Sequence, residues 1–178
     1  MRLLHSKKTF SVQLPSDFRE FVTQTGNGGA GPFYGILPLG VVDDNMGFRD
    51  WHEGDWLVGI PSEPFLSEED WNDVSGMPPA DLQERNETEY WSRMEAFERV
   101  YWGGWLVNGS MPICHEGCTL RILLVLTGKQ AGTLWEDRRS EYGGLRHVRL
   151  ADGSPASFGR WYREWLDACL SVSKLPIS

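Results

Sequence analysis

The sequence TLRILLVLTG, residues 119–128, contains the longest uninterrupted apolar run of the chain, the five residues from Ile122 to Leu126. A strand with one face in water alternates apolar and polar residues, whereas this run is apolar at every position. Turn-forming residues bound the run on both sides, which is typical of a strand. We therefore predict a central strand that is covered on both faces.

Further strands are predicted around this one. Short connections between neighbouring apolar segments favour antiparallel pairing. Pro112 favours an edge position or a strand start, because proline has no backbone N–H to donate. The candidate segments are FYGILPL (33–39), WLVNG (105–109), SMPICHE (110–116), AGTLWEDR (131–138) and LRHVRL (145–150).

Helices are predicted near both ends of the chain. The first lies in LPSDFREFVTQTGNGG (14–29), where apolar residues three and four positions apart share a face, and it is expected to end in a left-handed cap at Gly26 or Asn27. The last begins after Ser157, an expected N-cap, and carries an aromatic stripe that we interpret as core packing. The stripe consists of Phe158, Trp161, Tyr162, Trp165, Leu166, Cys169 and Leu170.

The middle of the chain has a less regular pattern. Residues 43–80 predict loops, short extended pieces and one helical turn in SEEDWNDV (67–74), where Ser67 and Asp70 resemble a capping box. Residues 80–100 predict a half-buried helix that ends at WGG (102–104).

Charge is spread unevenly along the 178 residues, a length that suits a single domain. The segment from Asp43 to Arg99 holds sixteen acidic and four basic residues, a local balance of −12, whereas the net charge of the whole chain is −8. An acidic surface argues against direct binding of nucleic acid, since phosphate contacts need clustered Lys and Arg. It favours a basic partner through electrostatic steering, or serves only to keep the surface solvated.

The three cysteines and the absence of a long apolar segment predict a cytoplasmic protein without a disulfide framework and without a membrane span. Cys114, His115 and Cys118 lie close enough in sequence to suggest a metal site or a cysteine nucleophile. A closed zinc site, however, requires four ligands, usually from two separate Cys or His pairs, and this sequence has no second pair. We favour the alternative in which both cysteines act as small apolar residues, and we expect no cofactor and no enzymatic activity.

The glycine-rich stretch NGGAGPFYG (27–35) does not predict a phosphate-binding loop, because it follows a helix and precedes an extended segment. Glycines that allow positive φ and close backbone packing are the better interpretation. Together with LPSDFREFV, MPICHEGC, LLVLTG, GTLWED and FGRWYREWLDACL, this stretch resembles the SUKH superfamily, also described as the Smi/Knr-like domain.

The resemblance covers residues 14–42 and 110–170, and it implies one α+β domain over 1–178. It implies an antiparallel-rich, curved sheet of about five to six strands packed against N-terminal and C-terminal helices. Residues 43–105 are a divergent acidic insert. By this resemblance the fold-defining positions are Gly28, Gly29, Gly31, Pro32, Tyr34, Gly117 and Cys118.

The resemblance also implies a function. Bacterial members of the superfamily are mostly cytoplasmic immunity proteins that occlude the active site of a cognate toxin, often a nuclease or another enzyme that acts on nucleic acid. Fungal relatives are multi-partner regulators of the cell wall, which is the alternative interpretation, and a Cys/His-dependent enzyme is a third. The partner surface is predicted at Asp43, Asp44, Asp50, Trp51, Glu53, Asp55, Trp56, Glu68, Glu69 and Asp70.

Overall fold

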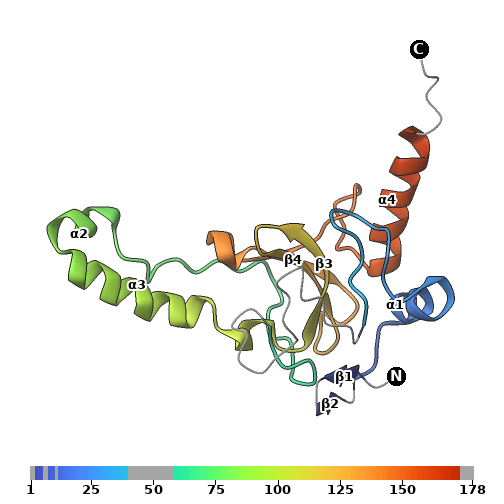
Figure 1. Ribbon diagram of the computed structural model, residues 1–178, viewed down its shortest axis with the longest axis horizontal. Helices are drawn as coiled ribbons and strands as arrows, with labels where there is room; N and C mark the ends of the chain where they lie inside the picture. Colours follow the sequence, from blue (N-terminus) through green and yellow to red (C-terminus); the bar gives the residue numbers. More distant parts are fainter. Residues whose placement is uncertain (1–2, 6–7, 11, 40–57, 173–178) are drawn as a thin grey trace.

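The computed structural model describes residues 3–5, 8–10, 12–39 and 58–172, which form an α+β fold (Figure 1). A short two-stranded antiparallel sheet comes first, and a four-stranded antiparallel sheet lies at the centre. The strands are β1 (Leu3–His5), β2 (Lys8–Phe10), β3 (Ser110–Gly117), β4 (Leu120–Val125), β5 (Leu134–Asp137) and β6 (Leu145–His147), and the α-helices are α1 (Ser16–Glu20), α2 (Ala80–Arg85), α3 (Glu87–Tyr101) and α4 (Phe158–Val172).

The central sheet has the order β3-β4-β5-β6, so each strand pairs with the next one along the chain. All six residues of β4 are buried. Ile122 and Leu124 belong to the core on one face of the sheet, whereas Leu123 and Val125 belong to the core on the other. The predicted central strand, covered on both faces, is therefore confirmed, and Pro112 lies on the edge strand β3 as expected.

One face of the sheet is covered by α1 and α4, which lie next to each other in Figure 1. Phe18, Phe21 and Phe158 form the aromatic centre of this larger core, with ring centroids 4.8 and 5.1 Å from Phe158 to the other two. The carboxylate of Asp17 accepts the backbone N–H of Gly159 at 2.8 Å. A carboxylate is favourable there, because the first N–H groups of α4 have no partner within the helix.

The first helix ends differently from the prediction. After α1 the chain makes one π-helical turn, Phe21–Thr25, and leaves it at Gly26 with φ 162° and ψ 157°. That conformation is extended, so the expected left-handed cap at Gly26 or Asn27 is not formed there. Positive φ appears instead at Gly28, where φ is 89°.

The opposite face of the sheet is covered by a 3-10 helix, η2 (Gly104–Val107), and by the segment that contains Phe65 and Trp71. The prediction of a strand in WLVNG was wrong, since its first three residues lie in η2. In this helix Trp105 points outward and Leu106 and Val107 point into the core. Apolar periodicity over so few residues does not distinguish a strand from a helical turn.

The central sheet in the described residues has four strands, not about five to six. The segment FYGILPL contributes only a single bridging residue, Ile36, which pairs with Gly29 and with Cys114 of β3. Gly35, directly before this residue, has a positive φ of 94°, and Pro38 follows two positions later without a backbone N–H, so the extended backbone is interrupted on both sides.

The predicted helix over residues 80–100 is present, but it is divided into α2 and α3, which extend away from the sheet as an arm (Figure 1). Asn86 divides them. Its backbone is not helical, and its side chain accepts the N–H of Glu89 at 3.2 Å as the N-cap of α3. The preference of asparagine for the N-cap position therefore interrupts what the sequence pattern predicts as one continuous helix. The expected end at WGG is confirmed, because Trp102 follows the last residue of α3.

A buried ion pair holds the base of this arm to the sheet. Arg139 and Asp137 are 0% and 2% exposed, and Nε and Nη2 of Arg139 each donate to one carboxylate oxygen of Asp137 at 2.8 Å. Nη1 of Arg139 donates to the carbonyl oxygen of Gly103 at 2.8 Å, and the indole of Trp102 donates to the carbonyl of Arg139. Both charges are thereby compensated inside the protein, as burial of charge requires.

The residues that the resemblance marks as fold-defining lie where the glycine-rich loop meets β3. The backbone N–H of Tyr34 donates to His115, and that of Leu37 donates to Ile113. A Cβ atom on Gly28 would lie 2.9 Å from the carbonyl oxygen of Ile36, and one on Gly31 would lie 2.8 Å from the side chain of Ile36. Close packing thus accounts for these glycines. Gly117 ends β3 and Cys118 begins the turn after it, both with positive φ.

Candidate protein-interaction site

The acidic segment near residues 67–74 does not form the predicted helical turn. It runs alongside β6 instead, where Trp71 and Leu145 exchange both backbone hydrogen bonds at 2.8 and 2.7 Å. The expected pair of Ser67 and Asp70 was wrong for the same reason. The carboxylate of Asp70 is used in a tertiary contact with His147 rather than in a local cap.

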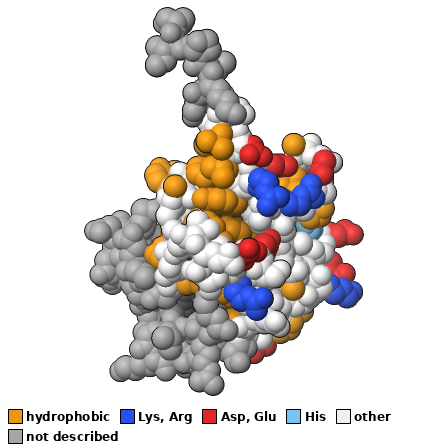
Figure 2. Space-filling view, turned by 90° about the vertical axis from the view of Figure 1, so that its right-hand side faces the viewer, with side chains coloured by type: hydrophobic (Ala, Val, Ile, Leu, Met, Phe, Trp, Pro, Cys, Tyr) orange, Lys and Arg blue, Asp and Glu red, His pale blue; other side chains and the backbone are white. Residues whose placement is uncertain are grey.

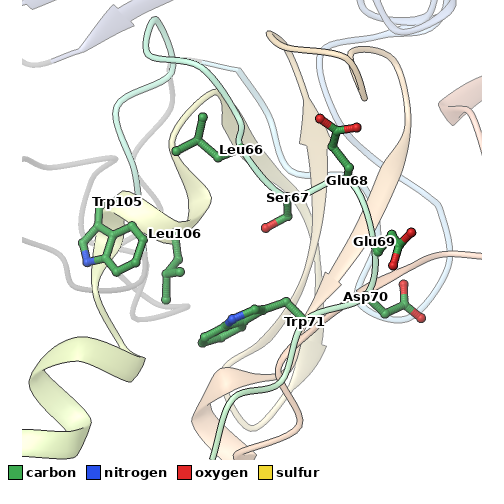
Figure 3. A pocket seen from close by; sticks show the side chains of 8 residues that line it. All are labelled: Leu66, Ser67, Glu68, Glu69, Asp70, Trp71, Trp105 and Leu106. Atoms are coloured by element: carbon green, nitrogen blue, oxygen red, sulfur yellow. The ribbon is translucent and has the colours of Figure 1, made fainter.

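This segment forms one wall of a groove of about 400 Å³, and η2 forms the other (Figure 3). The indoles of Trp71 and Trp105 and the side chains of Leu66 and Leu106 make its apolar part. Leu66 is 70% exposed and Trp105 is 55% exposed, so two large apolar side chains stand in water at its rim. The lining residues are Leu66, Ser67, Glu68, Glu69, Asp70, Trp71, Trp105 and Leu106. We call this feature the Trp105 groove.

The acidic residues of the groove lie on one segment and point away from the two indoles (Figure 3). Glu68 forms an ion pair with Lys129 at 2.7 Å, and its backbone carbonyl accepts the side-chain amide of Gln130 at 3.0 Å. The Glu69 side chain is exposed. The acidic wall is therefore partly neutralised from within the chain.

Asp70 is held more firmly than its neighbours. Its Oδ1 accepts the backbone N–H of His147 and lies 2.8 Å from Nδ1 of the same residue. Burial by itself would raise the pKa of Asp70, but the hydrogen bonds and the charge of His147 outweigh it and hold this pKa below its usual value of 3.8. Asp70 therefore stays ionised while it fastens the acidic segment to β6.

The structure brings together only part of the predicted partner surface. Glu68, Glu69 and Asp70 share one wall of the Trp105 groove. The other predicted members lie outside the described residues; they are Asp43, Asp44, Asp50, Trp51, Glu53, Asp55 and Trp56.

Sequence reasoning missed the apolar half of the site. Leu66 was detectable as a large apolar residue two positions before the acidic run that starts at Glu68, which is unusual for a solvated loop. Trp105 carried no such signal, because it belongs to a segment that reads as a buried strand. Its exposure follows from the 3-10 geometry of η2.

Cys114, His115 and Cys118 do not form a metal site. Within the described ranges, no group of three or more Cys, His, Asp or Glu side chains is placed to hold a metal ion. Cys114 is buried, its thiol donates to the carbonyl of Pro32 at 3.2 Å, and burial, with the nearby Glu116, raises its pKa to about 12. A thiol with such a pKa is a poor nucleophile at neutral pH. Cys114 therefore behaves as a buried apolar residue.

His115 and Cys118 lie at the end of β3 and in the turn after it. Nδ1 of His115 accepts the backbone N–H of Gly117 at 3.3 Å, and its ring centroid lies 5.6 Å from that of Tyr34. Burial and the charge of Arg121 lower the pKa of His115. Cys118 is exposed. These contacts shape the turn after β3 and its junction with the glycine-rich loop.

In the described parts of the chain, every helix is too short or too polar to cross a lipid bilayer. The structure instead offers a groove with exposed apolar side chains and an acidic wall, a combination of the kind found at protein interfaces. Comparison with known proteins adds no assignment, since no family model, no curated protein and no solved structure matches this chain.

Proposed function

We propose that this protein is an immunity protein that binds a cognate protein toxin and blocks its active site. The Trp105 groove is the observation that carries the proposal. Leu66 and Trp105 are both exposed at its rim, and the partly buried Trp71 lines the same groove. Exposed large apolar side chains that gather at one groove are typical anchors of a protein interface, where tryptophan is enriched among the residues that dominate binding energy.

Charge supports a basic partner. The arm formed by α2 and α3 holds six acidic and three basic residues. The three arginines pair with acidic residues one turn away, at 2.5 to 3.0 Å, which leaves a surplus of three negative charges on the arm. Enzymes that act on nucleic acid bind phosphate with Lys and Arg, so an acidic surface would speed their encounter with this protein.

The resemblance to the SUKH superfamily supports the same kind of partner, because it implies that bacterial members commonly neutralise a toxin. In this account the acidic arm and the acidic wall steer the toxin, and the apolar part of the groove slows its release. Blocking requires no bond to be made or broken by this chain.

Co-expression with the toxin encoded by a neighbouring gene tests the proposal. Cells that produce the toxin are expected to survive when they also produce this protein. Trp105→Ala is expected to reduce survival, whereas Trp91→Ala is expected to leave it unchanged. Trp91 is a matched control, because it is 52% exposed on α3 and does not line the groove. Survival no better than with an empty vector would refute the proposal.

A further inference from the structure

The acidic segment beside β6 forms an edge of the central sheet. Trp71 exchanges both backbone hydrogen bonds with Leu145, at 2.8 and 2.7 Å. In an antiparallel pair, the residues on either side of such a position direct their N–H and C=O groups to the opposite side of the strand. Asp70 and Asn72 occupy these positions, so their backbone groups face away from β6.

The backbone groups of Asp70 and Asn72 are open to a partner. In the part of the chain that the structure describes, neither residue donates or accepts a hydrogen bond through its backbone. Their side chains hold the segment in place instead, since Asp70 contacts His147 and Asn72 accepts the hydroxyl of Tyr101. Both residues are exposed. An exposed strand edge with unpaired N–H and C=O groups accepts a further strand from another chain.

The charge at this edge identifies what fits it. Residues 68–73 hold four carboxylates and no basic side chain; the carboxylates belong to Glu68, Glu69, Asp70 and Asp73. Lys129 pairs with Glu68, and His147 contacts Asp70. Glu69 and Asp73 are exposed, and neither forms an ion pair among the described residues. A strand added here brings its side chains next to these carboxylates, so a basic strand is complementary.

The Trp105 groove borders the same segment. Trp71 lines the groove together with Leu66 and Trp105, both of which are exposed (Figure 3). Successive side chains of a strand alternate between the two faces of a sheet, and side chains opposite each other on neighbouring strands share a face. An added strand therefore places every second side chain on the face of Trp71, where an apolar residue lies next to the groove. The residues before and after it carry the basic charges.

The exposed end of α4 offers a second apolar surface but no comparable charge. Leu166 and Leu170 are exposed, the latter at 51%, and Figure 2 shows hydrophobic side chains along this helix. Part of the stripe that was predicted to be core is therefore on the surface. The helix holds two basic and two acidic residues, Arg160, Arg163, Glu164 and Asp167. Its charge therefore selects no partner, whereas the edge at Asp70 and Asn72 favours a basic one.

We propose that the partner adds an extended segment, in which an apolar residue stands between basic ones, to the sheet edge at Asp70 and Asn72. The backbone of this segment pairs with the N–H and C=O groups that face away from β6. Its apolar side chain lies at the Trp105 groove, and its basic side chains lie near Glu69 and Asp73. This mode of binding deepens the proposed function, on which the identity of the partner as a toxin rests.

Nuclear magnetic resonance titration of the full chain with a short peptide of alternating lysine and valine tests strand addition without the toxin. We expect saturable binding that slows hydrogen exchange at the amides of Asp70 and Asn72. Two further peptides are N-methylated at every valine or at every lysine, so that only one of them loses the N–H groups that face the edge. We expect that one to bind at least about tenfold more weakly and the other to stay within about threefold. Equal affinities of all three peptides would overturn the proposal.

Charge variants test the location. Glu69→Gln is expected to weaken peptide binding about threefold or more, whereas Glu20→Gln, which removes an exposed carboxylate on α1, is expected to leave it unchanged. Equal weakening would show a response to overall charge and overturn the proposal. The toxin gives a separate readout. A peptide that pairs at the edge while the toxin fails to bind refutes only the toxin as partner. A toxin that binds without slowing exchange at Asp70 and Asn72 refutes only this mode of binding.

Discussion

Asp70 contacts His147 through both the backbone and the side chain of that residue, with both distances from Asp70 Oδ1 equal to 2.8 Å. The imidazole in turn packs on Trp135, with ring centroids 3.9 Å apart. These contacts attach the acidic wall of the Trp105 groove to β6 and to the core beneath it. One carboxylate from the acidic segment therefore has a structural role, whereas Glu69 remains free to face a partner.

Asp70→Asn is expected to lower the free energy of unfolding by about 0.5–1 kcal/mol at neutral pH, a small value because the carboxylate is about half exposed. The folded pKa of Asp70 lies below its usual value of 3.8, so its contribution is present above that value and is lost as the pH falls through the folded pKa. Urea titrations of both proteins should therefore converge under strongly acidic conditions.

Glu69→Gln is the control for this experiment, because its side chain is exposed in the same segment. It should leave the free energy of unfolding unchanged within about 0.5 kcal/mol at every pH. A stability difference between wild type and Asp70→Asn that grows as the pH falls would show that the contact with His147 does not favour the ionised carboxylate.

Gly28→Ala is expected to destabilise the protein by about 3 kcal/mol, since a Cβ atom there would lie 2.9 Å from the carbonyl oxygen of Ile36 and 2.9 Å from the nitrogen of Pro38. Gly132→Ala is the matched comparison. Gly132 has φ +92°, close to the +89° of Gly28, but no heavy atom lies within 4 Å of its added Cβ. Its cost should be only the backbone strain, about 1 kcal/mol. Similar midpoints for the two variants in thermal unfolding would refute close packing at Gly28.

Arg139→Met is expected to cost about 3–5 kcal/mol of unfolding free energy, because it leaves the carboxylate of Asp137 buried without its partner. Replacing both residues, as Asp137→Leu with Arg139→Met, should recover part of this loss. The neighbouring Arg138→Met, which removes only partly exposed ion pairs with Glu136 and Glu141, should cost about 1 kcal/mol or less. Chemical denaturation that ranks Arg138→Met as the more damaging change would contradict the buried pair as the anchor of the arm.

The cysteines should differ in reactivity. In a Cys169→Ser background, the exposed Cys118 is expected to react quickly with a disulfide reagent at about pH 8, whereas Cys114 should react only after unfolding. Burial and the raised pKa of Cys114, about 12, both protect its thiol. Rapid modification of two thiols in the folded protein would show that Cys114 is accessible and would reopen the cysteine-based interpretation.

The sequence predicts this fold best for elements whose apolar pattern shows which of their faces are buried. The apolar run of β4 indicates its central position, because burial on two faces removes alternation. The stripe of α4 likewise predicts a long helix, and Ser157 directly precedes it as expected, although the carboxylate of Asp17 accepts the helix N–H of Gly159. That carboxylate comes from the other end of the chain, which no local pattern can reveal.

The candidate site was predicted only in part for a related reason. Glu68, Glu69 and Asp70 stand out as a charge run, but a charge run does not show that Asp70 contacts His147, seventy-seven positions away. Trp105 was assigned to a buried strand, since local apolar pattern is the same for a short strand and a 3-10 turn. Trp105 is exposed because the two residues that follow it, Leu106 and Val107, are the ones that pack into the core.

Calorimetric titration of the full chain with the toxin domain encoded by the neighbouring gene measures the proposed interaction directly. We predict saturable binding that Trp105→Ala weakens at least about tenfold, while Trp91→Ala stays within about twofold of the wild type. Binding that is absent, or that is reduced equally by the two tryptophan substitutions, would contradict the Trp105 groove as the surface that holds the partner.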